Sequence, residues 1–335
     1  MAQIYLQDNG QGSKIKPIVS VVYTTFNHEA YVDSALKSFI EQETNFQYEI
    51  IIHDDCSTDG TAAIIQTYEQ RYPQKIHAIY QKENQWSKGK YPAFYFALLV
   101  ARGKYIAFCD GDDKWLSPIK LQRQVCAMKN FAVDMCGHPA IIITEDGKKL
   151  DRTAGQIVES PQHITAKKLI KKNSNMLPKS SIMISERVKL DLIENIPPVK
   201  FHTGLQLIGA RRTGFCVLPE PMAAYRANVP DSATKILLGS TAKQASTAEK
   251  KLKSLNRIYE LYDQDTRRYL RPMMATQLAY LLAMGWHEAK KQLTMLEALS
   301  RREKIMVFSV SLIKCVLLQA TISLRRTKKF LLKSQ

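Results

Sequence analysis

The sequence lacks the features that mark several classes of protein. Its six cysteines include no Cys-x-x-Cys pair, which argues against a disulfide framework or a zinc site and favours free thiols in a reducing compartment. The first sixteen residues hold no basic segment followed by an apolar run, so no secretory signal is predicted, and residues 1–16 are expected to form a loose leader. No helix-turn-helix, zinc-finger or RNA-recognition signal is present. We therefore expect a protein on the cytoplasmic side of the membrane that does not bind nucleic acid.

Acidic residues are comparatively few. The chain has 48 Lys and Arg against 31 Asp and Glu, which gives a net charge of +17 and an isoelectric point near 9.5. A basic protein of this kind attracts nucleic acid, an acidic membrane surface or a polyanionic substrate, and composition alone does not choose among them. The hydrophobic content of 45 % excludes a disordered chain, and 335 residues suffice for a sizeable core.

The order of residue patterns predicts an α/β domain followed by a helical region. Over residues 17–230 short β-branched runs alternate with turns and amphipathic stretches, which is typical of a mixed, mostly parallel sheet with flanking helices. Residues 231–300 are rich in Lys, Leu, Ala, Met and Glu and poor in Gly and Pro, which favours helices. Within the first domain, single strands are expected at Val133–Thr144, Lys179–Ile184 and Phe215–Tyr225.

Three segments of this domain end an apolar run with polar or acidic residues. They are Ile18–Asn27, Tyr48–Gly60 and Lys104–Asp113. In an open α/β sheet, ligands bind outside the carboxyl ends of the strands, so the three endings point to one shared crevice. Asn27 is also expected to cap the helix that follows it.

The segment Asp110–Asp113 predicts a divalent-cation site. Its first and third residues are carboxylates that flank Gly111, and its third and fourth would repel each other without a cation. Mg2+ is usually held by one or two carboxylates together with substrate phosphates, and a glycine lets the backbone approach a ligand closely. The alternatives are a solvated acidic turn here and, for Asp54 and Asp55 after the preceding strand, a helix entry.

Residues 301–335 predict a basic amphipathic tail that associates with an acidic membrane surface. Within it, residues 305–324 form a mostly apolar run with basic residues on both sides. Such a run just suffices to cross about 30 Å of hydrocarbon. However, Lys314 at mid-bilayer would cost about 2.5 to 3.5 kcal/mol, which favours a helix in the plane of the surface. A helix packed on the protein or a partner, and a membrane span, are the alternatives.

Three segments of the sequence resemble those of a known family. VSVVYTTFNHEAYVDSALKSFIEQ, EIIIHDDCSTDGTAAII and GKYIAFCDGDDKWLSPIKLQRQ resemble, in order and spacing, the N-terminal half of the family 2 glycosyltransferases with the GT-A fold. The resemblance covers about Pro17 to Lys129, thins out through Arg226 and does not reach the C-terminal region. It implies an inverting transfer of a sugar from a nucleotide-sugar, usually a UDP-sugar, to an acceptor hydroxyl.

The resemblance also implies roles for individual residues. Asp110 and Asp112 would be the family's DXD pair, with Asp112 the stronger candidate for contact with a Mg2+ or Mn2+ ion that bridges the diphosphate. Trp115 would wall the sugar or acceptor site or, alternatively, lie in the core, and Arg226 would clamp the diphosphate or form a buried ion pair. The residues implied to bind the donor are Thr24, Thr25, Asn27, Asp54, Asp55, Lys82, Asn84, Asp110, Asp113, Trp115 and Arg226.

The sequence departs from the family pattern where the general base should stand. The family supplies an Asp at the start of a late helix to deprotonate the acceptor, but the corresponding segment, residues 201–206, contains no carboxylate. Three interpretations remain open. His202 substitutes as the base, a carboxylate such as Glu220 or Asp231 serves instead, or the chain is a weak or inactive homologue that binds nucleotide-sugar as a module.

A second departure lies at Asn228. Many relatives have Arg-x-His there, and the His helps to bind the metal or diphosphate. An Asn amide oxygen is a weaker ligand, so the need for a metal is in question. A nucleotidyltransferase is the nearest enzymatic rival, but such enzymes open with a Gly-rich basic loop that Tyr23–Asn27 lacks.

These observations lead to one expected function. We expect a membrane-associated glycosyltransferase on the cytoplasmic face that extends a lipid-linked glycan for a surface polysaccharide. The donor sugar, the acceptor, the linkage and the oligomeric state are not indicated by the sequence, because sugar choice depends on the shape of a pocket and not on strand-end motifs.

Overall fold

The computed structural model describes residues 16–88, 93–172, 176–195, 202–227, 229 and 241–283. The chain divides into two compact units, residues 1–230 and residues 231–335, each of which is considered by itself. Asn228, Asp231 and the tail at 301–335, which the sequence singled out, lie outside the described residues.

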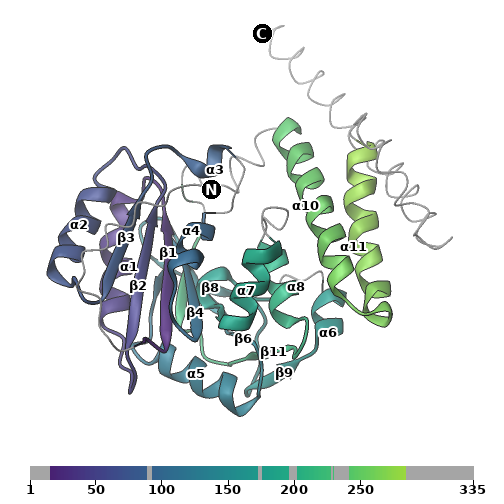
Figure 1. Cartoon of the computed structure of the whole chain (residues 1–335), viewed down its shortest axis with the longest axis horizontal. Coiled ribbons are helices and arrows are strands. Elements are labelled where there is room, and N and C mark those ends of the chain that lie inside the picture. Colours follow the sequence, from purple (N-terminus) through teal and green to yellow (C-terminus); the bar gives the residue numbers. More distant parts are fainter. Residues whose placement is uncertain are drawn as a thin grey trace, which may run out of the picture. The chain divides into compact units, whose positions relative to one another are not determined.

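An eight-stranded sheet forms the centre of the first unit (Figure 1). Its order is β3-β2-β1-β4-β10-β6-β11-β9, in which β3, β2, β1 and β4 are parallel and β10 is antiparallel to both neighbours. The strands are β1 Val19–Thr25, β2 Tyr48–Asp54, β3 Ile76–Tyr80, β4 Tyr105–Asp110, β6 Met135–Gly137, β9 Gln162–Ile164, β10 Met183–Ser185 and β11 Phe215–Val217. The predicted mixed α/β sheet is confirmed.

A smaller four-stranded sheet and a set of helices complete this unit. The small sheet has the order β5-β12-β7-β8. Its strands are β5 Lys114–Trp115, β7 Ala140–Ile143, β8 Lys149–Ala154 and β12 Ala223–Arg226. The helices are α1 Glu29–Ile40, α2 Thr61–Arg71, α3 Gln85–Lys88, α4 Tyr95–Val100, α5 Lys120–Asn130, α6 Ala166–Lys171, α7 Glu186–Asn195 and α8 His202–Ala210, with a 3-10 turn, η1, at Lys179–Ser181.

Burial explains why the central strands read as continuous apolar runs. Every residue of β1 and β2 is buried, as expected for parallel strands covered on both faces. On one face, the ring of Phe39 from α1 makes edge contacts with Tyr23 of β1 and Trp115 of β5. These large side chains dominate the core that holds the strand ends in place.

Three sequence predictions of single strands need correction, two of them because each range contains two strands. Val133–Thr144 contains β6 and β7, which belong to different sheets, and Phe215–Tyr225 contains β11 and β12, which do as well. Proline separates the members of each pair, Pro139 in the first and Pro219 with Pro221 in the second, because proline cannot donate a ladder hydrogen bond. In the third, the strand begins only at Met183, after η1.

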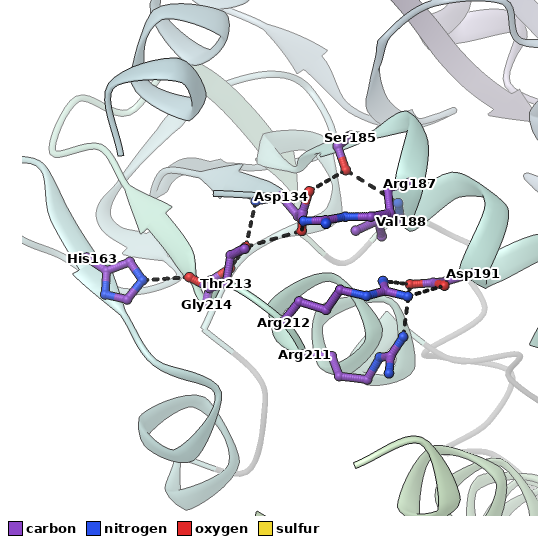
Figure 2. Close-up of polar contacts among 10 residues, drawn as sticks. All are labelled: Asp134, His163, Ser185, Arg187, Val188, Asp191, Arg211, Arg212, Thr213 and Gly214. Carbon is purple, nitrogen blue, oxygen red and sulfur yellow. Dashed lines mark hydrogen bonds and ion pairs between the residues drawn. The ribbon is translucent and has the colours of Figure 1, made fainter. Parts of the chain in front are cut away.

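A network of ion pairs fixes α7 and the carboxyl end of α8 beside the sheet (Figure 2). Asp191 of α7 pairs with Arg212, whose Nη2 donates to Oδ1 at 2.9 Å, and with Arg211 at 3.4 Å. Asp134, just before β6, pairs with Arg187 and accepts from the Ser185 hydroxyl at 2.8 Å. The network positions α8, whose first residue is His202.

The second unit is described over α10 Thr241–Leu261 and α11 Gln264–Ala283, which pack against each other. Leu252, Ile258 and Leu278 are among the side chains buried there. Across the part of the chain that the structure describes, every helix is too short or too polar to span a bilayer.

Candidate active site

The three polar strand endings do meet, as the sequence predicted. β1 lies between β2 and β4, with Thr25 opposite Asp54 and Thr24 opposite both His53 and Asp110. The loops that follow these strands therefore border one edge of the sheet. Asn27 joins two of them, because its Oδ1 accepts from the backbone N–H of Thr58 at 2.8 Å.

Asn27 does not cap α1, which corrects the prediction. Its φ of 53° is left-handed, a conformation that Asn tolerates better than most residues. The residue before α1 is His28, whose side chain makes no capping hydrogen bond. The left-handed turn instead aims the amide across to the loop after β2.

The Asp110–Asp113 turn is held close against the loop after β1. The Tyr23 hydroxyl donates to the carbonyl of Gly111 at 2.8 Å, and the N–H of Asp113 donates to the carbonyl of Asp110 at 3.1 Å. A Cβ on Gly111 would lie 2.1 Å from Nδ1 of His28, so any other residue would force the two loops apart. Glycine is required here for close approach.

The carboxylates of this turn disfavour one another's charge. Burial, followed by the charge of Asp110, raises the pKa of Asp112 to about 6. Burial, followed by the charges of Asp112 and Asp110, raises the pKa of Asp113 well above its ordinary range. A cation beside the turn would relieve this repulsion.

The donor set fits a divalent ion that completes its coordination from a substrate. Asp110 and Asp112 offer two carboxylates, as Mg2+ sites with phosphate ligands usually do. Within the described residues no group of three or more His, Cys, Asp or Glu could hold a metal by itself.

Arg226 ties the turn to the small sheet. Its backbone N–H donates to Oδ1 of Asp113 at 2.9 Å, and its Nε donates to the carbonyl of Asp112 at 2.9 Å. Its Nη1 donates to the carbonyls of Thr144 and Glu145 at 3.1 and 2.6 Å, and the guanidinium lies 4.5 Å from the ring centre of Tyr31. Through these carbonyl groups Arg226 holds the Asp110–Asp113 turn and the loop after β7 together.

A cavity of about 750 Å3 has Arg226 in its lining. Its walls come from the start of α1, from β5, from the turn between β7 and β8, and from β12. They include Tyr31, Lys114, Glu145 and Asp146. The volume lies within the range of small-molecule sites, and the mixed charges suit a polar ligand.

The two carboxylates after β2 are engaged in local structure. Asp55 accepts from the N–H groups of Gln85 and Trp86 at 2.7 and 2.9 Å, which caps the short helix α3. Asp54 accepts from the hydroxyl and the N–H of Ser57. Neither carboxylate caps α2, the helix after Ser57, because its N-cap residue is Gly60 and has no side-chain capping bond. Each ionised carboxylate can accept further hydrogen bonds.

The other predicted donor-binding residues differ in accessibility. Thr24 and Thr25 are almost fully buried, while Asn84 is half-buried and accepts from the N–H of Ser87 at 2.7 Å. Lys82 lies beside Asn84 in the loop after β3. Trp115 is only 3 % exposed and donates from Nε1 to the carbonyl of Ser180 at 3.0 Å, so it lies in the core.

His202 and Lys179 lie near the same turn. Lys179 of η1 forms an ion pair with Asp110, and its Nζ lies 5.2 Å from the ring centre of Phe94. Burial is the main reason that the pKa of His202 falls to about 4; Asp110 opposes this fall and Lys179 adds to it. The sequence analysis placed Lys179 in a strand and did not single it out. The signal that could have found it was a lone Lys directly after Leu177 and Pro178.

The alternative bases lie elsewhere or outside the description. Glu220 is exposed and pairs with Arg123 of α5 at 2.5 Å. Asp231 is not among the described residues. Asp110 raises the pKa of His202, so His202 lies within electrostatic reach of the turn.

Comparisons with known proteins identify the family. The model of "Glycosyl transferase family 2" matches residues 20–188, about half of the chain. The chain belongs to this family. It is 36 % identical over 152 residues to the putative teichuronic acid biosynthesis glycosyltransferase TuaG of Bacillus subtilis, covering 45 % of this chain and 56 % of that protein.

A second relative and a solved structure extend these comparisons. The chain is 31 % identical over 155 residues to the UDP-Glc:alpha-D-GlcNAc-diphosphoundecaprenol beta-1,3-glucosyltransferase WfgD of Escherichia coli, covering 46 % of this chain and 55 % of that protein. It thus spans just over half the length of these curated relatives. The crystal structure of S. aureus TarS 1–349 with UDP-GlcNAc superposes with a TM-score of 0.58 at 16 % identity, covering 87 % of this chain and 79 % of TarS, so this glycosyltransferase family 2 chain shares its fold.

The raised pKa of Asp112 predicts a pH-dependent stability. Because the folded-state pKa of about 6 exceeds the ordinary 3.8, the folded state takes up a proton between about pH 4 and 6 that the unfolded state does not. Stability therefore falls as pH rises through that window. At about pH 7 in EDTA, Asp112→Asn should raise the free energy of unfolding by about 1 to 2 kcal/mol, measured by urea denaturation.

The matched control is Asp151→Asn, an exposed carboxylate on β8. It should leave stability unchanged. The gain from Asp112→Asn should shrink as the pH falls towards about pH 3, where wild-type Asp112 is mostly protonated in both states. Equal stability of Asp112→Asn and wild type at about pH 7 would contradict the claim that the charge of Asp112 destabilises the folded state.

Proposed function

We propose that this chain is an inverting glycosyltransferase that transfers a sugar from a nucleotide-sugar, a UDP-sugar, to an acceptor hydroxyl. The observation that carries the proposal is the Asp110–Asp113 turn, held at the strand edge where β1, β2 and β4 end together. Its charge repulsion calls for a cation, and its donor set fits one that also binds phosphate. Family membership gives the reaction class.

Each part of the turn would serve the donor. Asp110 and Asp112 would hold Mg2+ or Mn2+, which supplies positive charge where the leaving diphosphate becomes more negative. Asp113 would act through Arg226, since their hydrogen bond fixes the turn. The nucleoside would lie over the loops that contain Thr24 to Asn27 and Asp54 with Asp55, and Lys82 and Asn84 would border it. Asn228 would be a further metal ligand.

A screen of donors tests this function. Purified protein is offered UDP-, GDP- and dTDP-sugars with Mn2+ or Mg2+, and release of the nucleoside diphosphate is measured. We expect one donor to be turned over, with Asp112→Asn reducing the rate about a hundredfold or more and EDTA acting in the same direction. Asp151→Asn should keep the wild-type rate. Full activity of Asp112→Asn would refute the metal role, and no turnover of any donor would refute the enzyme.

His202 is the proposed general base. It begins α8 and lies within electrostatic reach of Asp110, so an acceptor hydroxyl beside the turn would be near it. Its Nε2 lies 3.2 Å from Nε2 of Gln206, which would orient the ring. In this role it takes the proton that the acceptor hydroxyl loses as it attacks the anomeric carbon.

A matched pair of variants tests the base. His202→Ala should lower the turnover number about a hundredfold to ten-thousandfold while donor affinity stays within about threefold, because a base acts on the transition state. Glu220→Ala removes the alternative carboxylate and should leave turnover unchanged. Steady-state kinetics and donor titration give both quantities. A turnover loss in Glu220→Ala but not in His202→Ala would assign the base to Glu220.

A nucleotide-sugar-binding module is the second candidate, and one observation favours it. A His with a pKa of about 4 is a weak base at neutral pH. A chain with this donor site and no effective base would bind nucleotide-sugar without transfer. Tight nucleotide binding with no turnover in the donor screen would select this candidate over the enzyme.

We also propose a lipid-linked glycan as the acceptor and a peripheral position on the inner face of the cell membrane. Two relatives support this proposal: WfgD acts on a diphosphoundecaprenol-linked sugar, and TuaG is a putative glycosyltransferase of teichuronic acid biosynthesis. The basic tail at 301–335 supports the membrane position. Because the chain covers about half of each relative, this acceptor class is an inference from partial similarity.

Deleting residues 305–335 tests the membrane proposal. The full chain should co-sediment with phosphatidylglycerol vesicles and much less with phosphatidylcholine vesicles, because the basic flanks are attracted to acidic lipid. The truncated protein should remain in the supernatant with either lipid. A full chain that ignores phosphatidylglycerol vesicles would exclude the tail as an anchor.

A further inference from the structure

Lys179 places a positive charge inside the proposed donor site. Its ammonium pairs with Asp110, the first carboxylate of the predicted metal pair. It also lowers the pKa of Asp112 and of His202, so its charge reaches both other groups that the reaction would use. The side chain of Lys179 thus lies close to the Asp110–Asp113 turn, which would bind the metal, and to His202, the candidate base.

The surroundings of Lys179 hold it in this position. Its side chain is 15 % exposed, with the ammonium over the ring of Phe94 at 5.2 Å. The backbone of η1 packs against β4 and β12, and the N–H of Ser181 closes the turn on the carbonyl of Pro178 at 3.0 Å. A lysine held in this way loses little further side-chain freedom when it binds a ligand.

The Arg226 contacts strengthen the case for Lys179. Arg226 is the other cation at this turn that the sequence proposed for the diphosphate. Its Nε and Nη1 donate to three backbone carbonyls, of Asp112, Thr144 and Glu145. Lys179 is paired instead with a side-chain carboxylate that a divalent ion would also use. An ammonium has three N–H donors, so Lys179 can donate to Asp110 and to a phosphate beside it at the same time.

We propose that Lys179 binds the donor diphosphate, so that nucleotide binding retains a component that needs no divalent metal. This inference rests on the proposed function and adds a residue to its donor site. An ammonium is a compact point charge that binds phosphate well. Lys179 is a binding residue and transfers no atom to the donor.

The same charge would act when the sugar leaves. The bond between the anomeric carbon and the diphosphate oxygen breaks, and its electron pair stays on that oxygen. A bond to the acceptor oxygen forms, and the acceptor proton goes to the base. Lys179 would stabilise the extra charge on the diphosphate by a hydrogen bond and keep its own protons.

Nucleotide binding without metal tests the inference. UDP, GDP and dTDP are titrated by calorimetry into the full chain, in EDTA and with excess Mn2+. For whichever nucleotide the wild type binds, Lys179→Met should weaken binding in EDTA about tenfold or more, the loss of one hydrogen bond to a charged group. The loss should be smaller with Mn2+, which binds the same diphosphate. A merely structural defect would weaken binding equally in both conditions.

Matched variants separate charge from packing. Lys179→Arg keeps the charge and should retain binding in EDTA within about threefold. Lys37→Met removes a lysine that is 67 % exposed on α1, and should change nothing. If Lys179→Met does not fold, judged by its thermal transition, Lys179→Gln takes its place.

The outcomes distinguish this inference from the proposed function. Wild-type binding of a nucleotide that survives Lys179→Met in EDTA overturns the role of Lys179 alone. An equal loss in EDTA and in Mn2+ also overturns it, because the defect is then independent of the metal. No binding of any of the three nucleotides by the wild type, with or without Mn2+, overturns the proposed function and this inference together.

Discussion

The crowding of three carboxylates on one buried turn is the constraint on which the site depends. Asp110, Asp112 and Asp113 lie within four residues, and each of the last two has a pKa raised by burial and by its neighbours. A fold would not keep such a turn unless something compensated the charge. The contacts around it divide that task between neutral donors and two cations, Arg226 and Lys179.

The neutral donors fix the shape of the turn. Tyr23 holds the carbonyl of Gly111, and the backbone N–H of Arg226 holds the carboxylate of Asp113. Arg226 also links the turn to the small sheet, because its Nη1 donates to carbonyl groups on the loop after β7. Arg226 therefore links the β7–β8 turn, which lines the 750 Å3 cavity, to the Asp110–Asp113 turn.

The sequence predicted the strands that border the candidate site because those strands depend on local pattern. Continuous apolar runs that end in polar residues are enough to place β1, β2 and β4 and to bring their ends together. The small sheet escaped prediction, since β5 has two residues and its partner β12 comes more than a hundred residues later. The environment of Lys179 escaped as well, because tertiary contacts alone decide that it pairs with Asp110. Such contacts also decide between the two alternatives for Trp115, which lies in the core.

The weakness of His202 as a base follows from where the fold puts it, and so does the way it would change on donor binding. Burial is the larger cause of its low pKa, and Lys179 lowers it further while Asp110 raises it. A diphosphate that draws the ammonium of Lys179 to itself adds negative charge near the ring, and negative charge raises the pKa of a His. A divalent ion on the same diphosphate cancels much of that charge. Under the proposed function, the pKa of His202 would therefore depend on the net charge of the bound donor complex, and a divalent ion on the diphosphate would reduce the rise in that pKa.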